Sequence, residues 1–113
     1  MPKAFSSLRK KKRYVFFSVR SDGPVNYTDI KNAVFSSLLD WIGESELAKA
    51  DVNFIRNLWN GKSKTGVIRC SHKYVDKVKF GMSLVHQIGD QKVVFQTLRV
   101  SGTIKAGKAK SKL

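Results

Sequence analysis

Hydrophobic and polar positions alternate along residues 14–20, and this period of two is typical of a β-strand. Val15, Phe17 and Val19 fall on one face of the predicted strand, and the intervening positions fall on the other. Residues 21–24 (SDGP) then favour a turn, because Gly and Pro supply turn conformations and Ser and Asp bond to nearby backbone. The opposite face of the strand consists of Tyr14, Phe16, Ser18 and Arg20.

The following segment has the period of an amphipathic helix. Asn26 or Thr28 can cap its start, and Gly43 predicts its end. A further short helical turn is expected directly after that glycine. We interpret Trp41 as a core anchor, in preference to a platform on which bases stack. The apolar stripe of the helix consists of Ile30, Val34, Leu38 and Trp41.

The second half of the chain again alternates between the period of a strand and the period of a helix. Residues 52–60 predict a second strand, and residues 66–70 and 92–100 predict a third and a fourth. Between the last two strands we expect a helix that Ser71 caps and Gly89 ends. The apolar stripe of this helix consists of Val75, Val78, Met82 and Val85.

The predicted order of elements is strand, helix, short helix, strand, strand, helix, strand. Helices that cover one face of a four-stranded antiparallel sheet in this order form a split-βαβ sandwich. The sequence therefore predicts an α+β fold of the ferredoxin-like or RRM-like class. A length of 113 residues suits one such domain.

Charge adds a second feature to this picture. The chain has 22 basic and 8 acidic residues and a formal net charge of +14. Six basic residues lie in the first thirteen positions and four in the last nine, which leaves 12 for the body. We expect a flexible basic arm over residues 1–12, an RRM-like domain over 13–101 and a basic tail over 102–113. Such a charge distribution indicates a polyanionic partner.

Cys70 is the single cysteine, so an internal disulfide cannot form. We interpret it as a small buried hydrophobe on a strand, in preference to a reactive thiol. No apolar run approaches the roughly 20 residues of a membrane helix, and no signal-peptide pattern follows the basic N-terminus. We therefore expect a soluble, cytoplasmic protein without a membrane partner.

The chain offers no recognisable catalytic or metal-ligating motif. His72 and His86 are fourteen positions apart, too far to share a metal from one predicted helix. Cys70 and His72 resemble a thiol–imidazole pair, but nothing near them in sequence orients the imidazole. The Gly-Lys-Ser run at 61–63 lacks the first glycine of a P-loop, since Arg56 stands there. We expect no catalytic residues and no metal ligands in this chain.

The aromatic residues argue against the usual way in which an RRM reads single strands. Such domains stack bases on aromatic side chains of their two central strands. Residues 66–71 (GVIRCS) contain no aromatic residue, so only the first strand offers any. Tyr14 and Phe16 suit either base stacking or a protein interface. The pattern favours a structured RNA or a protein partner over a loose single strand.

Three segments of the sequence resemble a known family. Residues 64–71 (KTGVIRCS), residues 98–105 (LRVSGTIK) and the opening strand at 13–17 (RYVFF) are similar to the archaeal ribonuclease P protein component 2 family. The Gly-Glu junction at 43–44 fits the same family. The resemblance covers residues 13–105, and eukaryotic ribonuclease P and MRP particles contain a longer relative.

The resemblance implies a non-catalytic, RRM-like subunit of the ribonucleoprotein that removes 5′ leaders from precursor tRNA. In that family the RNA subunit cleaves the substrate, so Mg²⁺ is expected at the RNA and no cofactor on this chain. Ribonuclease P RNA and precursor tRNA are the implied nucleic-acid partners. The implied protein partner is the TIM-barrel subunit, protein component 3, with a heterotetramer as one expected assembly.

The candidate contacts follow from strand ends and basic segments. We expect Tyr14, Phe16, Ile55 and Trp59 to be candidates for a protein interface. A generic RRM-like single-strand RNA-binding or ribosome-associated protein is the alternative function, and a small ferredoxin-like hydrolase is a third. The candidate RNA contacts are Arg9, Lys10, Lys11, Lys12, Arg13, Arg69, Ser71, Lys73, Arg99, Ser101, Gly102, Thr103 and Lys105.

Overall fold

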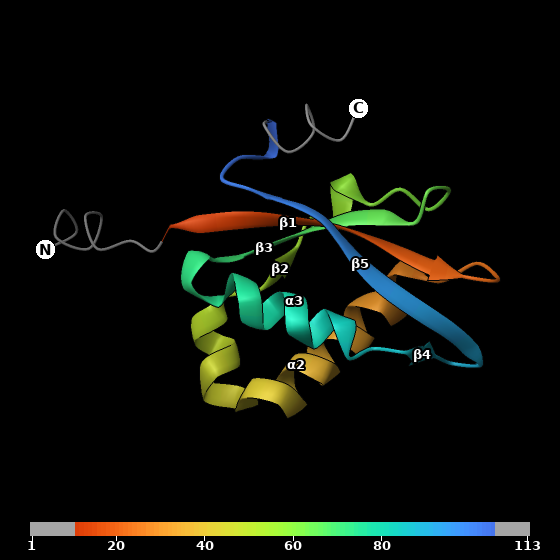
Figure 1. The fold of residues 1–113 in the computed structure, drawn as a ribbon, viewed down its shortest axis with the longest axis horizontal. Helices are drawn as coiled ribbons and strands as arrows, with labels where there is room; N and C mark the ends of the chain where they lie inside the picture. The colour runs from red at the N-terminus through yellow and green to blue at the C-terminus, as the bar shows by residue number, and fades with distance from the viewer. Residues whose placement is uncertain (1–10, 106–113) are drawn as a thin grey trace, which may run out of the picture.

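The computed structural model describes residues 11–105 as one α+β sandwich (Figure 1). The parts of the predicted arm and tail at residues 1–10 and 106–113 lie outside the described residues, and with them Arg9 and Lys10. In chain order the elements are β1 (Lys12–Ser21), α2 (Tyr27–Ala50), β2 (Asn53–Phe54), the 3₁₀ turn η1 (Arg56–Leu58), β3 (Thr65–Ser71), the 3₁₀ turn η2 (His72–Tyr74), α3 (Val75–Ser83), β4 (Gln87–Ile88) and β5 (Gln91–Ser101).

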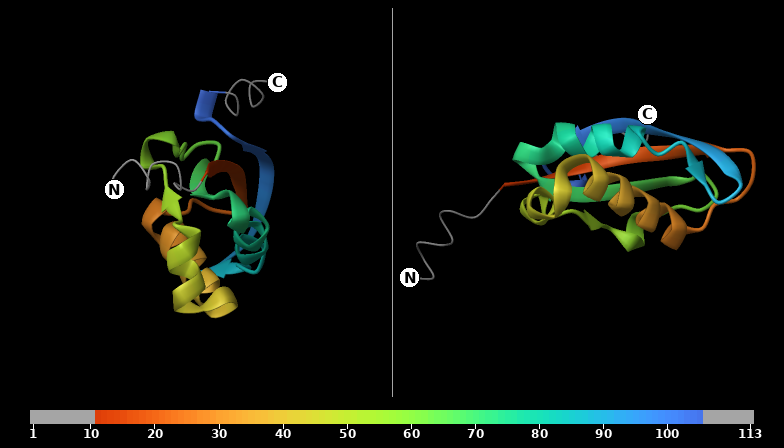
Figure 2. Two further views of the ribbon diagram at one scale, coloured as in Figure 1. Left: turned by 90° about the vertical axis from the view of Figure 1, so that its left-hand side faces the viewer. Right: turned by 90° about the horizontal axis from the view of Figure 1, so that it is seen from below.

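The sheet is antiparallel, with the strand order β2-β3-β1-β5-β4. Both helices lie on one face of it, as two views at right angles show (Figure 2). The segment after β2 and the end of β5 rise on the other side (Figure 1). The predicted fold class is confirmed. The number of strands is five and not four, because the two-residue β4 extends the sheet beyond β5.

The core lies between the helices and the central strands β1, β3 and β5. On β1 it takes the alternating positions that the sequence predicts, and the helices contribute one stripe each. Cys70, at the end of β3, is fully buried, which agrees with its interpretation as a small hydrophobe. The fully buried hydrophobic side chains include Val15, Phe17, Ile30, Val34, Leu38, Ile68, Cys70, Val78 and Met82.

Helix α2 begins where the sequence predicts and bends at Gly43, the residue that was expected to end it. The backbone N–H of Thr28 donates to the Asn26 side chain at 2.7 Å, so Asn26 is the N-cap. Gly43 has a φ of +82° inside the helix, which turns the chain before a short second helical segment. The interpretation of Trp41 as a core anchor is wrong. It is 44% exposed and packs on Phe80 of α3, with ring centroids 4.6 Å apart.

Two predicted elements differ from the structure. The expected strand over 52–60 is paired only at Asn53–Phe54, since η1 follows and turns the chain out of the sheet. The expected helix from Ser71 to Gly89 covers only Val75–Ser83, and the Ser71 side chain does not cap it. Val85 is still buried, but beyond the helix, where the chain turns to form β4.

In the part of the chain from residue 11 to 105, no helix is long and apolar enough to cross a membrane. Over the same range, His, Cys, Asp and Glu side chains form no group of three that could hold a metal ion.

Candidate nucleic-acid interface

The face of the sheet that the helices leave uncovered is built from alternate residues of three strands. Tyr14 on β1 lies opposite Arg69 on β3 and Ser101 on β5. Phe16, two residues on, lies opposite Val67. Because side chains alternate between the two sides of a sheet, all of these lie on the side away from the helices. We call this surface the open face.

A β-bulge in β5 shapes the open face. Phe16 is paired with Arg99 and Phe17 with Thr97, so Leu98 is the extra residue between them. Arg99 therefore lies beside Phe16 on the open face, and the bulged Leu98 is 41% exposed. Phe95 before the bulge and Val100 after it both point to the helix side of the sheet. Val100 lies opposite Val15 of β1.

Two arginines on the open face are incompletely bonded. Within residues 11–105, the Nε atoms of Arg69 and Arg99 are buried and have no hydrogen-bond partner. Both residues lie on strands next to β1, on either side of its Tyr14–Phe16 segment. A guanidinium presents several donors in one plane, an arrangement that matches the oxygens of a phosphate.

Acidic residues are segregated from this surface. All eight lie in the described range, on helices or in turns, and none belongs to β1, β3 or β5. The same three strands carry six basic residues. The sheet thus presents a positive surface without internal carboxylates to neutralise it. The basic residues of the three strands are Lys12, Arg13, Arg20, Arg69, Lys92 and Arg99.

One carboxylate approaches the open face from its edge. Asp51 follows α2 in a left-handed conformation and forms an ion pair with Lys12. The hydrogen bond from Lys12 is the main reason why the pKa of the Asp51 carboxyl is lowered, and the nearby positive charge of Arg69 adds to the effect. Lys12 is therefore committed to Asp51, whereas Arg99 has no such carboxylate neighbour within the described residues.

The predicted contacts at the ends of the strands are brought together only in part. Arg13 lies opposite the buried Cys70, on the helix side, and its Nη1 donates to the Lys12 carbonyl at 3.0 Å. Ser71 is fully buried. Lys11 is exposed just before β1, and its carbonyl accepts the backbone N–H of His72 at 2.8 Å. Lys73 is exposed on η2, beyond the end of the sheet.

The predicted contact segment after β5 is folded back on itself. The Ser101 hydroxyl donates to the Thr103 carbonyl at 2.7 Å and accepts the Thr103 backbone N–H at 3.2 Å. This turn occupies the backbone N–H of Thr103, one of the candidate RNA contacts. Gly102 and Lys105 are exposed and lie at the same end of the sheet as Tyr14.

The four candidates for a protein interface do not form one patch. Tyr14 lies half-buried on the open face, where Phe16 is only 6% exposed. The backbone N–H of Ile55 donates to the Val67 carbonyl at 3.0 Å, at the edge of the sheet. Trp59 packs on Tyr27 of α2, with ring centroids 5.5 Å apart, and so belongs to the helix side.

A hollow of about 400 Å³ on the open face was not predicted. Phe16 and Val67 lie at its base, while Leu58 of η1 and the bulged Leu98 belong to its walls. The alternation of β1 indicates the side on which Phe16 lies. The walls depend on a 3₁₀ turn and on a bulge, for which the sequence carries no periodic signal.

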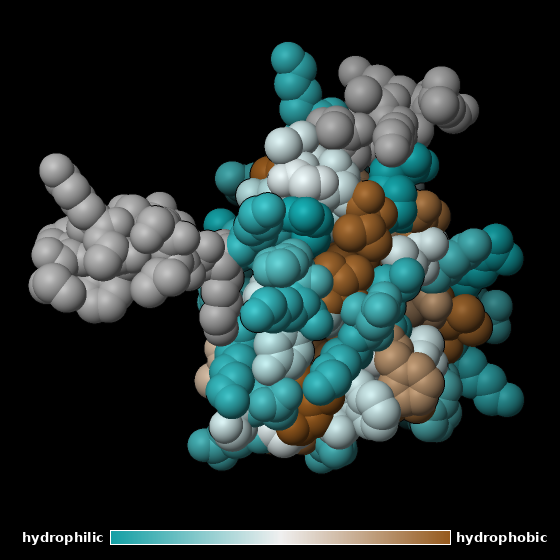
Figure 3. Space-filling model, turned by 60° about the vertical axis from the view of Figure 1, so that its left-hand side comes forward, coloured by the Kyte–Doolittle hydropathy of each residue, from teal (hydrophilic) through white to brown (hydrophobic). Residues whose placement is uncertain are grey.

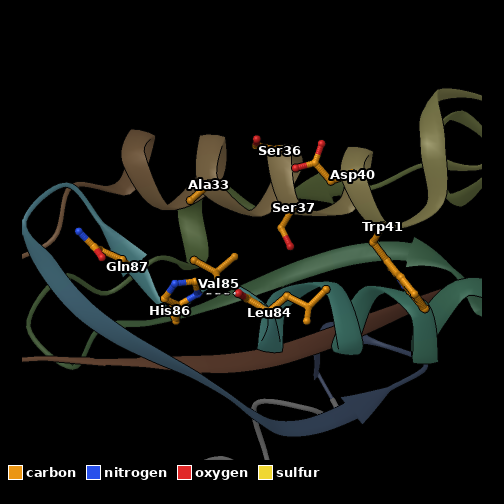
Figure 4. A pocket seen from close by; sticks show the side chains of 9 residues that line it. All are labelled: Ala33, Ser36, Ser37, Asp40, Trp41, Leu84, Val85, His86 and Gln87. Atoms are coloured by element: carbon orange, nitrogen blue, oxygen red, sulfur yellow. Dashed lines mark hydrogen bonds between the residues drawn. The ribbon is translucent and has the colours of Figure 1, made fainter.

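The helix side has a different character. Trp41, Phe80 and Leu84 are each 44–46% exposed. On the side of the molecule drawn in Figure 3, apolar surface emerges as strips between hydrophilic side chains. A second hollow, of about 520 Å³, lies between α2 and the segment that ends α3 (Figure 4). Its lining includes Ala33, Ser37 and Trp41 from α2, and Leu84, Val85 and His86 from the end of α3 and beyond.

The helix-side hollow has no paired nucleophile and base among its described residues. The Ser37 hydroxyl donates to the Gly81 carbonyl at 2.7 Å, and the His86 Nδ1 lies 3.2 Å from the Leu84 carbonyl. Each group is thus bonded to the backbone and not to the other. The hydrolase interpretation gains no support from this site.

Comparisons with known proteins agree with the predicted resemblance. The family model for the Rpp14/Pop5 family matches residues 13–112. Ribonuclease P protein component 2 of Thermococcus gammatolerans is 38% identical over 92% of this chain and 85% of its own length. The protein of the same name from Pyrococcus furiosus is 39% identical with the same coverage. That from Methanosarcina mazei is 32% identical over 93% of this chain and 87% of its own.

Among solved structures, a chain of the yeast ribonuclease MRP structure has a similar fold, with a TM-score of 0.63. The match covers 92% of both chains at 13% identity, so it supports the fold alone. The extent of the family match and the identity to the archaeal relatives together show that this chain belongs to the Rpp14/Pop5 family.

Proposed function

We propose that this chain is a non-catalytic protein subunit of a ribonuclease P- or MRP-type ribonucleoprotein, and that its open face binds the RNA subunit. The observation that carries the proposal is the pair Arg69 and Arg99, whose buried Nε atoms lack partners within the described residues. They lie on a sheet whose three main strands contain no carboxylate. An RNA backbone supplies the anionic oxygens that such a surface lacks.

The proposal extends to the partners of the family's archaeal members. In this assembly the RNA subunit cleaves precursor tRNA with Mg²⁺, and this chain stabilises the RNA by neutralising phosphates. A TIM-barrel protein subunit binds the same chain on another surface. Exposed apolar side chains suit such an interface, and the helix side offers Trp41, Phe80 and Leu84.

Single substitutions test the role of the open face. We expect Arg69→Ala and Arg99→Ala each to weaken binding to the RNA subunit about tenfold, the effect of losing one charge-assisted hydrogen bond. The slope of log affinity against log salt should fall by about 0.7–0.9 for each phosphate contact removed. Fluorescence anisotropy with labelled RNA subunit at several salt concentrations measures both quantities.

Lys31→Ala is the matched control, since Lys31 is exposed on α2 on the opposite side of the sheet. Lys31→Ala removes the same unit of charge as the arginine variants. It should therefore change the RNA affinity and the salt slope only by the small amount that the lower net charge causes. Reconstituted cleavage of precursor tRNA should need more Mg²⁺ with the arginine variants than with Lys31→Ala. Equal behaviour of all three variants in both assays would contradict the proposal.

A further inference from the structure

The hollow on the open face has an apolar interior and a polar rim. Phe16 and Val67, paired across β1 and β3, form its base. Leu58 of η1 borders the hollow beyond β3, and the bulged Leu98 of β5 borders it on the other side of β1. At about 400 Å³ it falls in the range of small-molecule binding sites, about 300–1,000 Å³.

The rim is well organised. The Asn60 side-chain carbonyl accepts the backbone N–H groups of Lys62 and Ser63 at 2.9 and 3.1 Å. Ser63 and Thr65 share a hydroxyl hydrogen bond of 2.8 Å. Asn60 is one of the residues that line the hollow, and its amide N–H₂ donors bond to no residue between 11 and 105. An occupant with acceptor atoms on its edge can bind them.

The arginines lie directly beside the hollow. Arg99 lies opposite Phe16, and Arg69, two residues beyond Val67 on β3, lies opposite Tyr14. Because β3 and β5 flank β1 with about 4.8 Å between adjacent strands, both arginine side chains can reach a group held above β1. A ligand that suits this arrangement has a flat apolar body next to an anionic group.

We propose that the hollow binds the base of one unpaired nucleotide, extruded from a folded RNA, while Arg69 and Arg99 hold its flanking phosphate. This proposal rests on the proposed function, since it specifies what the open face recognises in RNA. An apolar side chain from a protein would fill the hollow equally well. The positive charge beside the hollow, without a carboxylate on β1, β3 or β5, favours the nucleotide.

The inference distinguishes this surface from an RRM that reads several bases in a row. The open-face positions of β3 hold no aromatic residue, so this strand has no ring on which a second base can stack; they are Thr65, Val67, Arg69 and Ser71. One hollow beside one pair of arginines fits a single nucleotide. The chain would therefore recognise the shape of a bulge or loop more than a sequence.

Two RNA hairpins that differ by one nucleotide test this inference with the full chain. One has a perfectly paired stem, and the other carries a single extruded adenosine in the same stem. We expect the bulged hairpin to bind about tenfold more tightly, within the usual effect of packing one base on an aromatic side chain. Leu98→Ala should reduce this preference to about threefold or less, because it weakens binding to the bulged hairpin more than binding to the paired one.

Leu39→Ala is the matched control, because Leu39 is exposed to a similar degree, 45% against 41%, but lies on α2. It should keep the full preference for the bulge. Leu58→Ala provides a second variant of the hollow, with the same expected result as Leu98→Ala. Replacing the extruded adenosine by 2-aminopurine should give a fluorescence change on binding that Leu98→Ala diminishes.

Other results of these binding experiments would overturn either the inference or the proposed function. Equal binding of both hairpins by the wild-type chain, or a preference that Leu98→Ala leaves intact, overturns the inference and leaves the proposed function standing. Failure to bind either hairpin or the RNA subunit overturns the proposed function first. If Leu98→Ala binds both hairpins as the wild type does but loses a protein subunit from the assembly, the occupant is a protein side chain.

Discussion

At the scale of single residues, Gly66 is a position where the packing leaves no room for a side chain. A methyl group there would lie 2.8 Å from Cζ of the fully buried Phe17 and 3.1 Å from Cε3 of Trp59. We expect Gly66→Ala to lower the free energy of unfolding by about 1–3 kcal/mol, the usual cost of overpacking. Urea denaturation measures the loss.

The control for this prediction is Gly61→Ala. Its methyl group would meet nothing closer than Nε1 of Trp59 at 3.7 Å, so stability should change by less than about 0.5 kcal/mol. Equal effects at both glycines would show that the backbone, and not the contact with Phe17, limits position 66.

Cys70 provides a second prediction at this scale. Burial raises the pKa of its thiol to about 11, so at neutral pH the sulfur stays protonated and shielded. In the folded chain we expect no labelling by a disulfide reagent on a timescale of minutes, and complete labelling once urea unfolds the domain. Prompt labelling of the native protein would contradict the packing of β3 against the helices.

Among single residues, the sequence predicted the core of β1 and the burial of Cys70 but misplaced Trp41. Its spacing continues the stripe of Leu38, which is fully buried. The helix turns at Gly43, however, and Trp41 lies at the outer edge of the contact with Phe80. Periodicity gives the direction of a side chain from its helix axis, but not where the neighbouring helix ends.

At the scale of elements, the ion pair between Lys12 and Asp51 joins the start of β1 to the end of α2. The lowered pKa of Asp51 means that the pair stabilises the fold at pH values above about 3.9, the carboxyl pKa of an unfolded chain. This contribution is lost as the pH falls through the lower pKa of the folded state, because the carboxyl is then protonated in both states.

Asp51→Asn tests this link, since Asn tolerates the left-handed backbone found there. Both partners are partly exposed, so we expect the variant to be less stable by about 0.2–1 kcal/mol at neutral pH. The difference should vanish in acid, as urea denaturation across a pH series can show. Asp90→Asn, at an exposed turn, is the control. A gap that persisted in acid would exclude the ion pair as its cause.

Helix α2 and the strands β1, β3 and β5 were predictable because their patterns are regular over two or more periods. The strands observed at 12–21, 65–71 and 91–101 extend the predictions by one or two residues at each end. The structure of residues 52–60 was not predictable in this way, because only two of them form a strand that pairs with β3 and the others turn away from the sheet. Short pairings such as β4 depend on the partner strand and carry too few residues to show a period.

At the scale of the whole molecule, the open face divides into a predictable and an unpredictable part. Arg69 and Arg99 were identified from their places near strand ends, and the structure puts both on the open face. Two further candidate contacts, Ser101 and Thr103, are bonded to each other, since the Ser101 hydroxyl accepts the Thr103 backbone N–H. The hollow depends on side chains from separate elements, and only the folded chain brings them together.

The bulge at Leu98 has a consequence for insertions and deletions in this family of folds. Before the bulge the odd-numbered residues of β5, such as Val93 and Phe95, point to the helices. After the bulge the even-numbered Val100 does so. The single extra residue Leu98 thus changes which positions of β5 face the helices. A regularly alternating β5 of the same length, without the bulge, would direct Arg99 into the core and Val100 to solvent, whereas deletion of Leu98 would remove the bulge and leave both residues on their present sides. What the open face presents is therefore set by the way in which β5 accommodates Leu98 as well as by the identity of its residues.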